Sequence, residues 1–386
     1  MRLHTVSLST LCKGGGSYGI AASAVEYSAS LPTYLRITDI NDDGTLNFDG
    51  LKSVADPNAS KYYLAPNDIV FARTGASTGR NYFYDGTDGS FVYAGFLIKF
   101  SIDPQKINPL FIKYYCQSKD YYTWVASFNT GSTRGNMNAV TLGNMPIPAI
   151  PKEQQDLLAA TLSALDAKIA NNTAMNRCLE QMAQAIFSDT FGFVLHGNVP
   201  MGEFLRFANG FAFKSSTYLD TGRYKIITIK NVQDGSVDSA GASCLDELPT
   251  GFNSSCMLAF GDVLLSLTGN VGRVGIVTED NLLLNQRVAK FDPINQKLLP
   301  FWYFLFRQTE MKDYLFSIAK GTAQQNLSPI ETLKTKIFFD ETTAAKYAGS
   351  AAALFWKIAE NRRESKRLAT LRDTLLPRLM SGELTI

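Results

Sequence analysis

Two long stretches of the chain place apolar side chains at alternating intervals of four and three residues. The first stretch, residues 152–191, contains no proline and no glycine. Its apolar positions are Leu158, Leu162, Leu165, Ile169, Leu179, Ala183 and Ile186. The second stretch, residues 341–380, follows the same template with Tyr347, Ala351, Leu354, Ile358, Leu368, Leu375 and Leu379. A seam this narrow, held over about five heptads, predicts two long helices that pair as a coiled coil.

Both seams also carry polar residues at equivalent heptad positions, which favours pairing of the two helices. These residues are Asn172 and Asn176 in the first helix and Asn361 and Ser365 in the second. Buried polar residues in a seam commonly fix register and partner at some cost in stability. The alternative is that each helix packs only on its own domain.

The chain is a repeat of two similar halves, which is the feature to look for before any other. Residues 64–75 and 258–269 are identical at five of twelve positions, and residues 164–172 and 353–361 at six of nine. A third, shorter match lies between these two. All three lie 189 to 194 residues apart and in the same order, so they indicate a tandem duplication. A pseudo-twofold axis between the halves would pair the helices antiparallel, with a globular domain at each end.

The remaining segments, residues 1–150 and 199–340, are rich in β-branched and aromatic residues with frequent turn signals. This pattern predicts two domains of short strands with a few helices. Aromatic helices are expected at 107–124 and 298–318, with Trp302, Tyr303, Phe304 and Phe306 in the core. The expected fold class is therefore α+β: two recognition-type domains of small mixed sheets, at 1–150 and 199–340, separated by two long antiparallel helices at 151–198 and 341–386.

Composition narrows the class of protein. The 386 residues are 45% hydrophobic and 19% charged, so a folded core is expected. A net charge of +2 excludes a wholly basic DNA coat, although it allows local basic patches. Five cysteines without a C-x-x-C pair, together with only two histidines, argue against a structural zinc site or a disulfide framework. No apolar run approaches the ~18 residues of a membrane span, so we expect a cytoplasmic protein.

Motifs of common enzymes are missing from the sequence. The pair Gly-Lys never occurs, so there is no phosphate-binding P-loop, and there is no G-x-S-x-G motif. An amino-methyltransferase would need Asn-Pro-Pro or Asp-Pro-Pro followed by an aromatic residue, and neither occurs. We therefore expect a binding protein with no catalytic residue and no metal ligand. An enzyme subunit with an unrecognised carboxylate pair is the alternative from another class.

Six segments taken in order resemble a known family. They are Pro146–Gln155, Asn209–Ser216, Thr228–Gly235, Leu258–Gly269, Asn285-Gln286-Arg287 and Gly321–Leu327. Together with the repeat of domain and helix, they resemble the DNA-specificity (S) subunits of Type I restriction–modification systems. Two places depart from that pattern. Phe338–Thr343 lacks the prolines and the Glu-Gln pair that precede the first helix, and Lys13–Gly19 differs from the opening at Asn209–Ser216.

This resemblance implies a division of labour between subunits. Each domain would read one half of a bipartite, asymmetric sequence in double-stranded DNA, and the helices would set the spacing between the halves. Two modification subunits with S-adenosylmethionine would dock on this chain, and two restriction subunits with ATP and Mg would complete the complex. The chain itself would hold no cofactor. A subunit of a fused nuclease–methylase system, or a coiled-coil scaffold that ignores DNA, are the alternatives.

Three loops in each half combine glycine with residue types that contact phosphates and bases. The candidates in the first half are Lys13, Ser17, Tyr18, Arg73, Ser77, Arg80, Arg134 and Asn136. Those in the second half are Lys214, Ser215, Asn270, Arg273, Gln324 and Gln325. Residues shared by both copies can hardly encode different half-sites and are also explained as ordinary β-turns. The differences are therefore the candidate readers: Arg134 against Gln324, and Arg73 against Leu267.

The second long helix carries four basic residues, Arg362, Arg363, Lys366 and Arg367. They are expected to form a solvated face. The alternatives are contacts with an acidic partner surface or with DNA phosphates between the half-sites.

Overall fold

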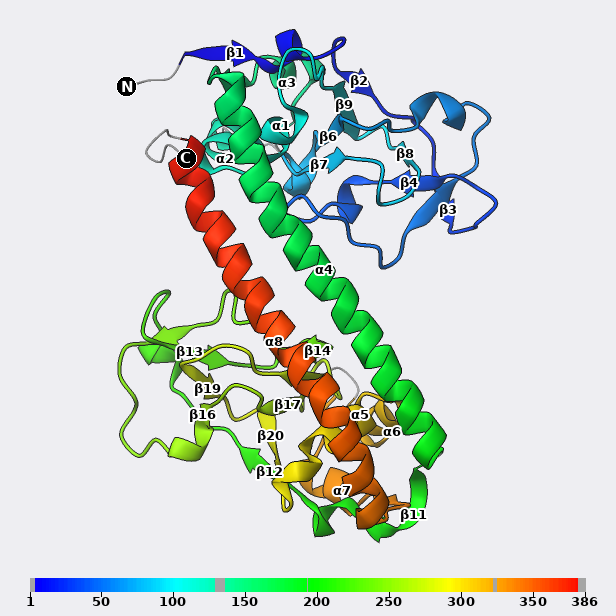
Figure 1. The fold of residues 1–386 in the computed structure, drawn as a ribbon, viewed down its shortest axis with the longest axis vertical. Coiled ribbons are helices and arrows are strands. Elements are labelled where there is room, and N and C mark those ends of the chain that lie inside the picture. The colour runs from blue at the N-terminus through cyan, green and yellow to red at the C-terminus, as the bar shows by residue number, and fades with distance from the viewer. Residues whose placement is uncertain (1–3, 129–135, 193, 322–324, 381–386) are drawn as a thin grey trace. The chain divides into compact units, whose positions relative to one another are not determined.

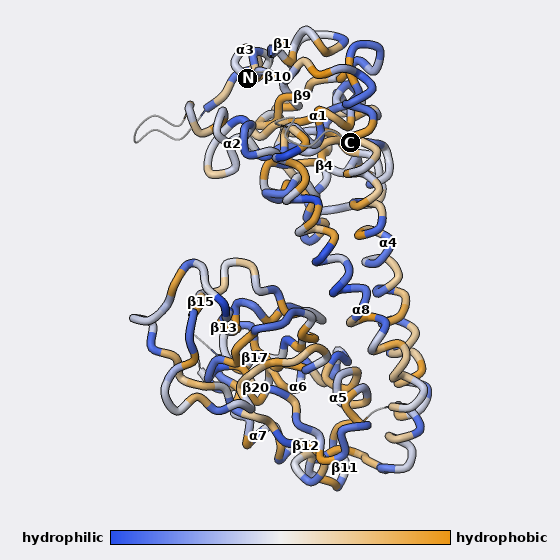
Figure 2. The backbone as a smooth tube through the Cα atoms, turned by 60° about the vertical axis from the view of Figure 1, so that its left-hand side comes forward, coloured by the Kyte–Doolittle hydropathy of each residue, from blue (hydrophilic) through white to orange (hydrophobic). Residues whose placement is uncertain are grey.

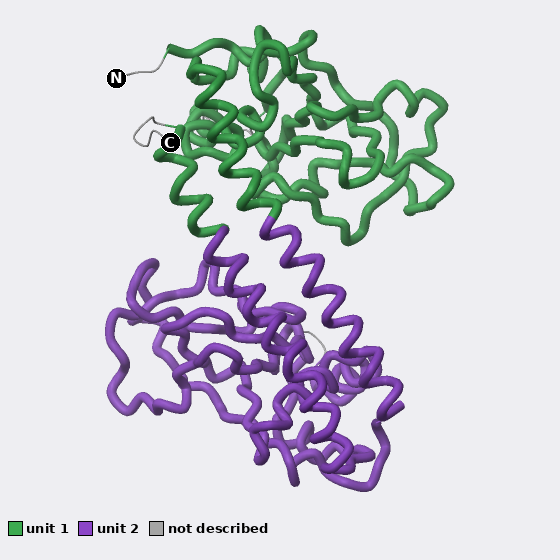
Figure 3. Tube along the Cα trace, in the orientation of Figure 1, with its two compact units in different colours: residues 1–167, 369–386 green, residues 168–368 purple. Residues whose placement is uncertain are grey.

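The computed structural model describes residues 4–128, 136–192, 194–321 and 325–380. The chain divides into two compact units, residues 1–167 with 369–386 and residues 168–368 (Figure 3). Each unit contains one globular domain together with parts of both long helices. None of the helices within the described ranges has the length and apolarity needed to cross a membrane.

In its described residues, unit 1 has ten short strands and three short α-helices besides the long helices (Figure 1). The strands are β1 (Thr5–Ser7), β2 (Ser17–Tyr18), β3 (Ala24–Glu26), β4 (Thr33–Leu35), β5 (Lys52–Val54), β6 (Asp68–Ala72), β7 (Asn81–Tyr84), β8 (Phe91–Tyr93), β9 (Leu97–Ser101) and β10 (Pro146–Pro148). The helices are α1 (Pro109–Tyr115), α2 (Lys119–Ala126) and α3 (Ala139–Gly143). The sheets have the orders β2-β9-β6-β7, β3-β5-β4-β8 and β1-β10.

Unit 2 repeats this plan with its own strands and helices. The strands are β11 (Leu195–Pro200), β12 (Leu205–Asn209), β13 (Tyr224–Ile227), β14 (Gly235–Ser236), β15 (Cys244–Leu245), β16 (Met257–Leu258), β17 (Val263–Ser266), β18 (Val274–Ile276), β19 (Leu282–Leu284), β20 (Val288–Pro293) and β21 (Lys336–Ile337). The helices are α5 (Leu299–Phe306), α6 (Thr309–Ile318) and α7 (Pro329–Lys334). The sheets have the orders β12-β20-β17-β18-β14, β15-β13-β19-β16 and β11-β21.

The two units share specific contacts at equivalent positions, as a duplication predicts. Asp68 at the start of β6 forms an ion pair with Lys99 on β9 at 3.1 Å. Asp262, just before β17, forms the matching pair with Lys290 on β20 at 3.4 Å. In both units the same carboxylate also accepts from the backbone N–H three residues earlier. The expected α+β class of small mixed sheets in a tandem repeat is confirmed.

The aromatic helices expected at 107–124 and 298–318 are each broken into two. In unit 1 the first piece ends at Tyr115, and Ser118 caps α2, because its hydroxyl accepts from the N–H of Tyr121. In unit 2 the break falls at Gln308, before α6. The expected core residues Trp302, Tyr303, Phe304 and Phe306 are all fully buried.

The long helices are α4 (Lys152–Phe191) and α8 (Glu341–Met380), each of 40 residues. Hydrophilic and hydrophobic stretches alternate along both of them (Figure 2). Residues 195–198, which the sequence pattern grouped with the first helix, belong instead to β11, which pairs with β21. Pro377 lies inside the last turns of α8.

Within unit 1, the beginning of α4 and the end of α8 pack into one core with α1. Leu158 and Leu162 are buried there together with Leu376 and Leu379, and Leu165 and Leu375 are partly buried at its edge. Asp166 on α4 accepts hydrogen bonds from Arg372 on α8 at 2.9 Å and from the Tyr114 hydroxyl at 2.8 Å. In this unit the two helices therefore run antiparallel.

Within unit 2, the polar seam residues contact one another across the helix pair. Asn361 donates to Asn176 at 2.9 Å, and the Asn172 amide lies 3.3 Å from the Ser365 hydroxyl and 3.4 Å from the Asn361 carbonyl. Asn172 thus meets its own counterpart in the repeat, which is the contact expected for symmetric antiparallel helices. Leu179, Leu354 and Ile358 line the apolar core beside this polar section.

The seam departs from the expected heptads at a few positions. Ile186 is 41% exposed, and Phe187 is buried in its place. Ile169 and Leu368 are half-buried. The seam shifts by one residue towards the C-terminus of α4 because Phe187 packs against Phe301 and Tyr347 of unit 2.

Candidate nucleic-acid interface

A surface arginine between two exposed aromatic rings marks one edge of unit 1. Arg73 directly follows β6, and its guanidinium carbon lies 5.2 Å from the ring centre of Tyr18 and 6.0 Å from that of Phe96. The two rings are 43% and 55% exposed. The Arg73 Nε has no hydrogen-bond partner among the described residues. Cation–π contacts with the two rings hold the guanidinium in place. The rings carry no net charge, so they do not neutralise the charge of Arg73.

The third candidate loop of unit 1 joins the same edge. The backbone N–H of Met137 donates to the Arg73 carbonyl at 2.8 Å, and Asn136 forms a β-bridge with Thr74. The N–H of Ala139 donates to the Tyr18 hydroxyl at 3.2 Å. The structure therefore brings three of the candidate residues, Tyr18, Arg73 and Asn136, together at one edge. Arg134 lies outside the described residues.

The other candidate DNA-contacting residues of unit 1 differ from one another in exposure and in bonding. Lys13 is exposed, and the Ser17 hydroxyl is 3.0 Å from that of Tyr93. Arg80 donates to Asp42 at 2.6 Å and to the Ile40 carbonyl at 3.3 Å, so its charge is already matched within the domain. Ser77 belongs to the short 3₁₀ turn Gly75–Ser77 and is half-buried.

The corresponding edge of unit 2 is built by the same backbone pattern. The N–H of Leu327 donates to the Leu267 carbonyl at 2.7 Å, and Asn326 forms a β-bridge with Thr268. The Asn326 side-chain oxygen accepts from the Thr268 hydroxyl at 2.8 Å and from Arg287 at 3.4 Å. Gln325 lies beside this bridge, and its side-chain oxygen is buried without a partner among the described residues.

The remaining candidates of unit 2 lie apart from this bridge or are already bonded. Arg273 donates to Gln233 at 2.8 Å, which parallels the bonding of Arg80 in unit 1. Asn270, Lys214 and Ser215 are exposed, with Ser215 at the start of a short 3₁₀ turn. Gln324 lies outside the described residues.

Sequence reasoning missed Phe96 and Arg287 as members of this surface. Each lies on a strand connection, and each is placed by the register between neighbouring strands. Arg287 belongs to the Asn-Gln-Arg segment that carried part of the family resemblance. Aligning the two halves through this segment would have paired Arg287 with Phe96 and revealed the site.

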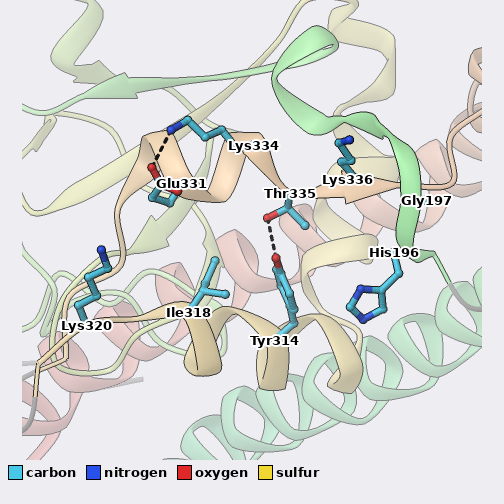
Figure 4. A pocket seen from close by; sticks show the side chains of 9 residues that line it. All are labelled: His196, Gly197, Tyr314, Ile318, Lys320, Glu331, Lys334, Thr335 and Lys336. Carbon is cyan, nitrogen blue, oxygen red and sulfur yellow. Dashed lines mark hydrogen bonds and ion pairs between the residues drawn. The ribbon is translucent and has the colours of Figure 1, made fainter.

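A cavity of about 620 Å³ opens near the bridge of unit 2 (Figure 4). Lys320, Lys334 and Lys336 contribute to its lining, together with Tyr314 and His196. Lys320 exchanges two backbone hydrogen bonds with Asn326, so the basic cavity and the bridge belong to one surface. Glu331 also lines the cavity and pairs with Lys334 at 2.8 Å, so Lys320 and Lys336 are the cations that suit an anion such as a phosphate group.

The basic residues of α8 do not form a free solvated face. Arg362 donates to Glu180 at 2.6 Å, and Arg363 pairs with Asp280 at 2.9 Å. Lys366 forms a 2.5 Å ion pair with Glu279. These three side chains therefore bind the domain of their own unit, which corrects the expectation of a solvated or DNA-facing surface. Arg367 is exposed.

Glu180 is the centre of this charged network. It accepts hydrogen bonds from Arg307 at 2.8 Å, from Arg362 and from the Tyr303 hydroxyl at 3.0 Å. Burial alone would raise the pKa of Glu180, but the two guanidinium groups outweigh burial, and its pKa lies below the ordinary value. The carboxylate therefore stays charged and ties α4 to α5 and α8.

The fold and this surface define a tandem DNA-specificity protein, and comparison with known proteins gives the family. The profile of the Type I restriction modification DNA specificity domain matches residues 33–181 and 197–337. The chain belongs to this family. It is a specificity subunit of the Type I restriction–modification class, and a fused nuclease–methylase system is not favoured.

Two relatives are similar in sequence along most of the chain, and one solved structure shares its fold. The Type I restriction enzyme MjaIX specificity subunit of Methanocaldococcus jannaschii is 25% identical over 303 residues, 72% of this chain and 69% of that protein. The HindI specificity subunit of Haemophilus influenzae is 21% identical over 410 residues, 85% and 89% of the two chains. The crystal structure of a Type I S subunit from M. genitalium has the same fold, with a TM-score of 0.58, 18% identity and coverage of 98% and 96%.

Proposed function

We propose that each unit reads one half of a bipartite double-stranded DNA target through the edge formed by its β-bridge. The carrying observation is that both units hold an arginine at this edge, Arg73 in unit 1 and Arg287 in unit 2, beside an exposed bridge asparagine. Arginine is the side chain that most often reads a base in the major groove, and asparagine is a common second. Because the two edges differ in sequence, the two half-sites differ as well.

Phosphate contacts would come from the basic residues around these edges. In unit 2, Lys320 and Lys336 of the cavity would neutralise backbone phosphates next to the bridge, whereas Lys334 pairs with Glu331. In unit 1 the exposed Lys13 is placed on the same segment as Tyr18. Such contacts position the protein without carrying sequence information.

The chain carries no chemistry of its own in this proposal. It would recruit two modification subunits that hold S-adenosylmethionine and methylate adenine, and two restriction subunits that use ATP and Mg. It would act in the cytoplasm, where the DNA is. The paired helices α4 and α8 would set the distance between the half-sites, since 40 residues of α-helix extend for about 60 Å.

Adenine methylation mapped across a genome tests this function directly. The chain is produced together with its modification subunits in cells that lack other methylation, and every methylated adenine is located. We expect one asymmetric pair of half-sites at a fixed spacing, and selective binding of the purified complex to that sequence over a scrambled one. Methylation without a shared sequence, or equal binding to both DNAs, would refute the proposal. Activity of the chain without its partners would favour the enzyme alternative.

A further inference from the structure

The arginines that carry the proposed function do not occupy the same position in the two units. The Arg73 N–H donates to the Phe96 carbonyl at 3.1 Å, and the Leu267 N–H donates to the Arg287 carbonyl at 3.3 Å. Both hydrogen bonds lie at the end of the central strand, where the pairing of β6 with β9, or of β17 with β20, ends. Arg73 is therefore equivalent to Leu267, and Phe96 is equivalent to Arg287. In unit 1 the arginine follows the central strand, whereas in unit 2 it lies on the adjacent segment, at the position of Phe96.

A third position completes the set. Tyr18 is followed by Gly19, and Asn209 is followed by Gly210. At both glycines a Cβ atom would lie within 2.2 Å of a carbonyl oxygen on the segment that leads to Phe96 or Arg287. Only glycine fits there, so Tyr18 and Asn209 are held at equivalent places beside that segment. The three positions are Tyr18, Arg73 and Phe96 in unit 1, and Asn209, Leu267 and Arg287 in unit 2.

Arg73 and Arg287 have different neighbours, as expected from their different positions. In unit 1 the two exposed rings flank the Arg73 guanidinium and limit its rotamers. In unit 2 the Leu267 side chain is 8% exposed and belongs to the core, while Arg287 is exposed beside the Asn326 oxygen. Each unit thus presents one oriented guanidinium at this edge, from a different segment.

A contact to phosphate does not explain this exchange. Phosphates repeat along every DNA sequence, so a phosphate-binding charge would suit the same position in both copies. Arginines with a role inside the domain also keep their position in both copies. Arg80 and Arg273 occupy equivalent positions, and both are bonded within their own domain, to Asp42 and Gln233. A charge that moves between copies is expected of a residue that reads a base.

We propose that the members of this set that reach the surface, Tyr18, Arg73 and Phe96 in unit 1 and Asn209 and Arg287 in unit 2, read bases, and that the position of the arginine decides which base pair of the half-site must carry guanine. This inference rests on the proposed function. Neighbouring segments of a sheet lie about 4.8 Å apart, whereas successive base pairs are about 3.4 Å apart. Moving the arginine from one segment to the next therefore displaces the guanine requirement by one or two base pairs.

Three variants in unit 1 test the proposal in the assembled complex. Arg73→Ala removes the reader, and Arg73→Lys keeps the charge without the two-pronged donor geometry that guanine requires. The double variant Arg73→Leu with Phe96→Arg copies the arrangement of unit 2. Arg80→Ala is the matched control, because it removes an arginine from the same hairpin that is already paired with Asp42. Methylation mapping and binding to single-base variants of the target are measured for each.

Arg73→Ala and Arg73→Lys should relax one position of one half-site, with discrimination there reduced about 5- to 150-fold. The other half-site should be unchanged, and so should both half-sites of Arg80→Ala. The double variant should require guanine one or two base pairs away from its original position. If wild type is selective and the Arg73 variants lose affinity equally for target and random DNA, or keep full selectivity, this inference is wrong while the proposed function stands. If wild type itself shows no selectivity, the proposed function fails.

Discussion

Lengthening both long helices by the same amount should widen the spacer of the DNA target. The units meet along the chain at Ala167–Lys168 in α4 and at Leu368–Ala369 in α8. Four helix-forming residues inserted at each of these two junctions leave every contact within a unit in place. Both insertions are needed, because α4 and α8 are antiparallel partners in each unit and an insertion in one alone would shift their register.

The expected change follows from helix geometry. Four residues lengthen a helix by about 6 Å at 1.5 Å per residue, which corresponds to one or two base pairs of about 3.4 Å. Four residues are slightly more than one turn, and a coiled coil accommodates them as a local stutter. Seven residues preserve the heptad phase and add about 10.5 Å, or about three base pairs. The two variants together give a graded series.

Methylation mapping with the modification subunits reports half-sites and spacing at once. Both variants should methylate the original half-sites at the wider spacings. A control variant with four residues inserted in the exposed turn at Gly241, where no atom lies within 4 Å of an added Cβ, should keep the original spacing. An unchanged spacer in a helix variant that still methylates would show that helix length does not set the distance.

Further predictions concern the contacts that hold unit 2 together. Glu180→Gln leaves the Arg307 and Arg362 charges without their buried partner and should cost about 3–5 kcal/mol of unfolding free energy in chemical denaturation, unlike a substitution in an exposed ion pair. The folded-state pKa of Glu180 is below the unfolded value of about 4.3, so its contribution is present above that pH and is lost as pH falls through the folded pKa. The wild-type unfolding free energy should therefore fall more steeply below pH 5 than that of Glu180→Gln; equal slopes would contradict this. Replacing Asn172 and Asn361 together by leucine should leave the stability equal or higher but blur the spacing of methylated sites; an unchanged spacing would show that the amides do not fix register.

The architecture was predictable from the sequence because its signals are local and repeated. The run from Lys152 to Phe191 has no helix breaker and a sustained seam, and α4 spans those residues. The duplication at 64–75 and 258–269 corresponds to strands β6 and β17, which occupy central places in equivalent sheets. These features depend on neighbours within a few residues along the chain.

The surface was harder to predict because its members meet through pairing between distant segments. Phe96 reaches Arg73 through a strand register that no local pattern encodes. The basic residues Arg362 and Arg363 looked solvated because their acceptors, Glu180 and Asp280, lie more than 80 residues away in sequence. Sequence periodicity identifies a helix face, but the partner of that face depends on tertiary packing.

The buried amides at Asn172 and Asn361 also determine by how much the spacing between the two half-sites could deviate from its correct value. Sliding α8 by one heptad along α4 would move it by about 10.5 Å and place the Asn361 amide against apolar neighbours such as Ile169 or Leu179. Each buried amide left without a partner costs about 1–3 kcal/mol, so two of them would hold slipped pairs to about 3% of molecules or fewer. Intermediate displacements would turn the apolar seam away from its partner altogether. A misread spacing would therefore be rare and would differ from the correct one by a whole step of about three base pairs.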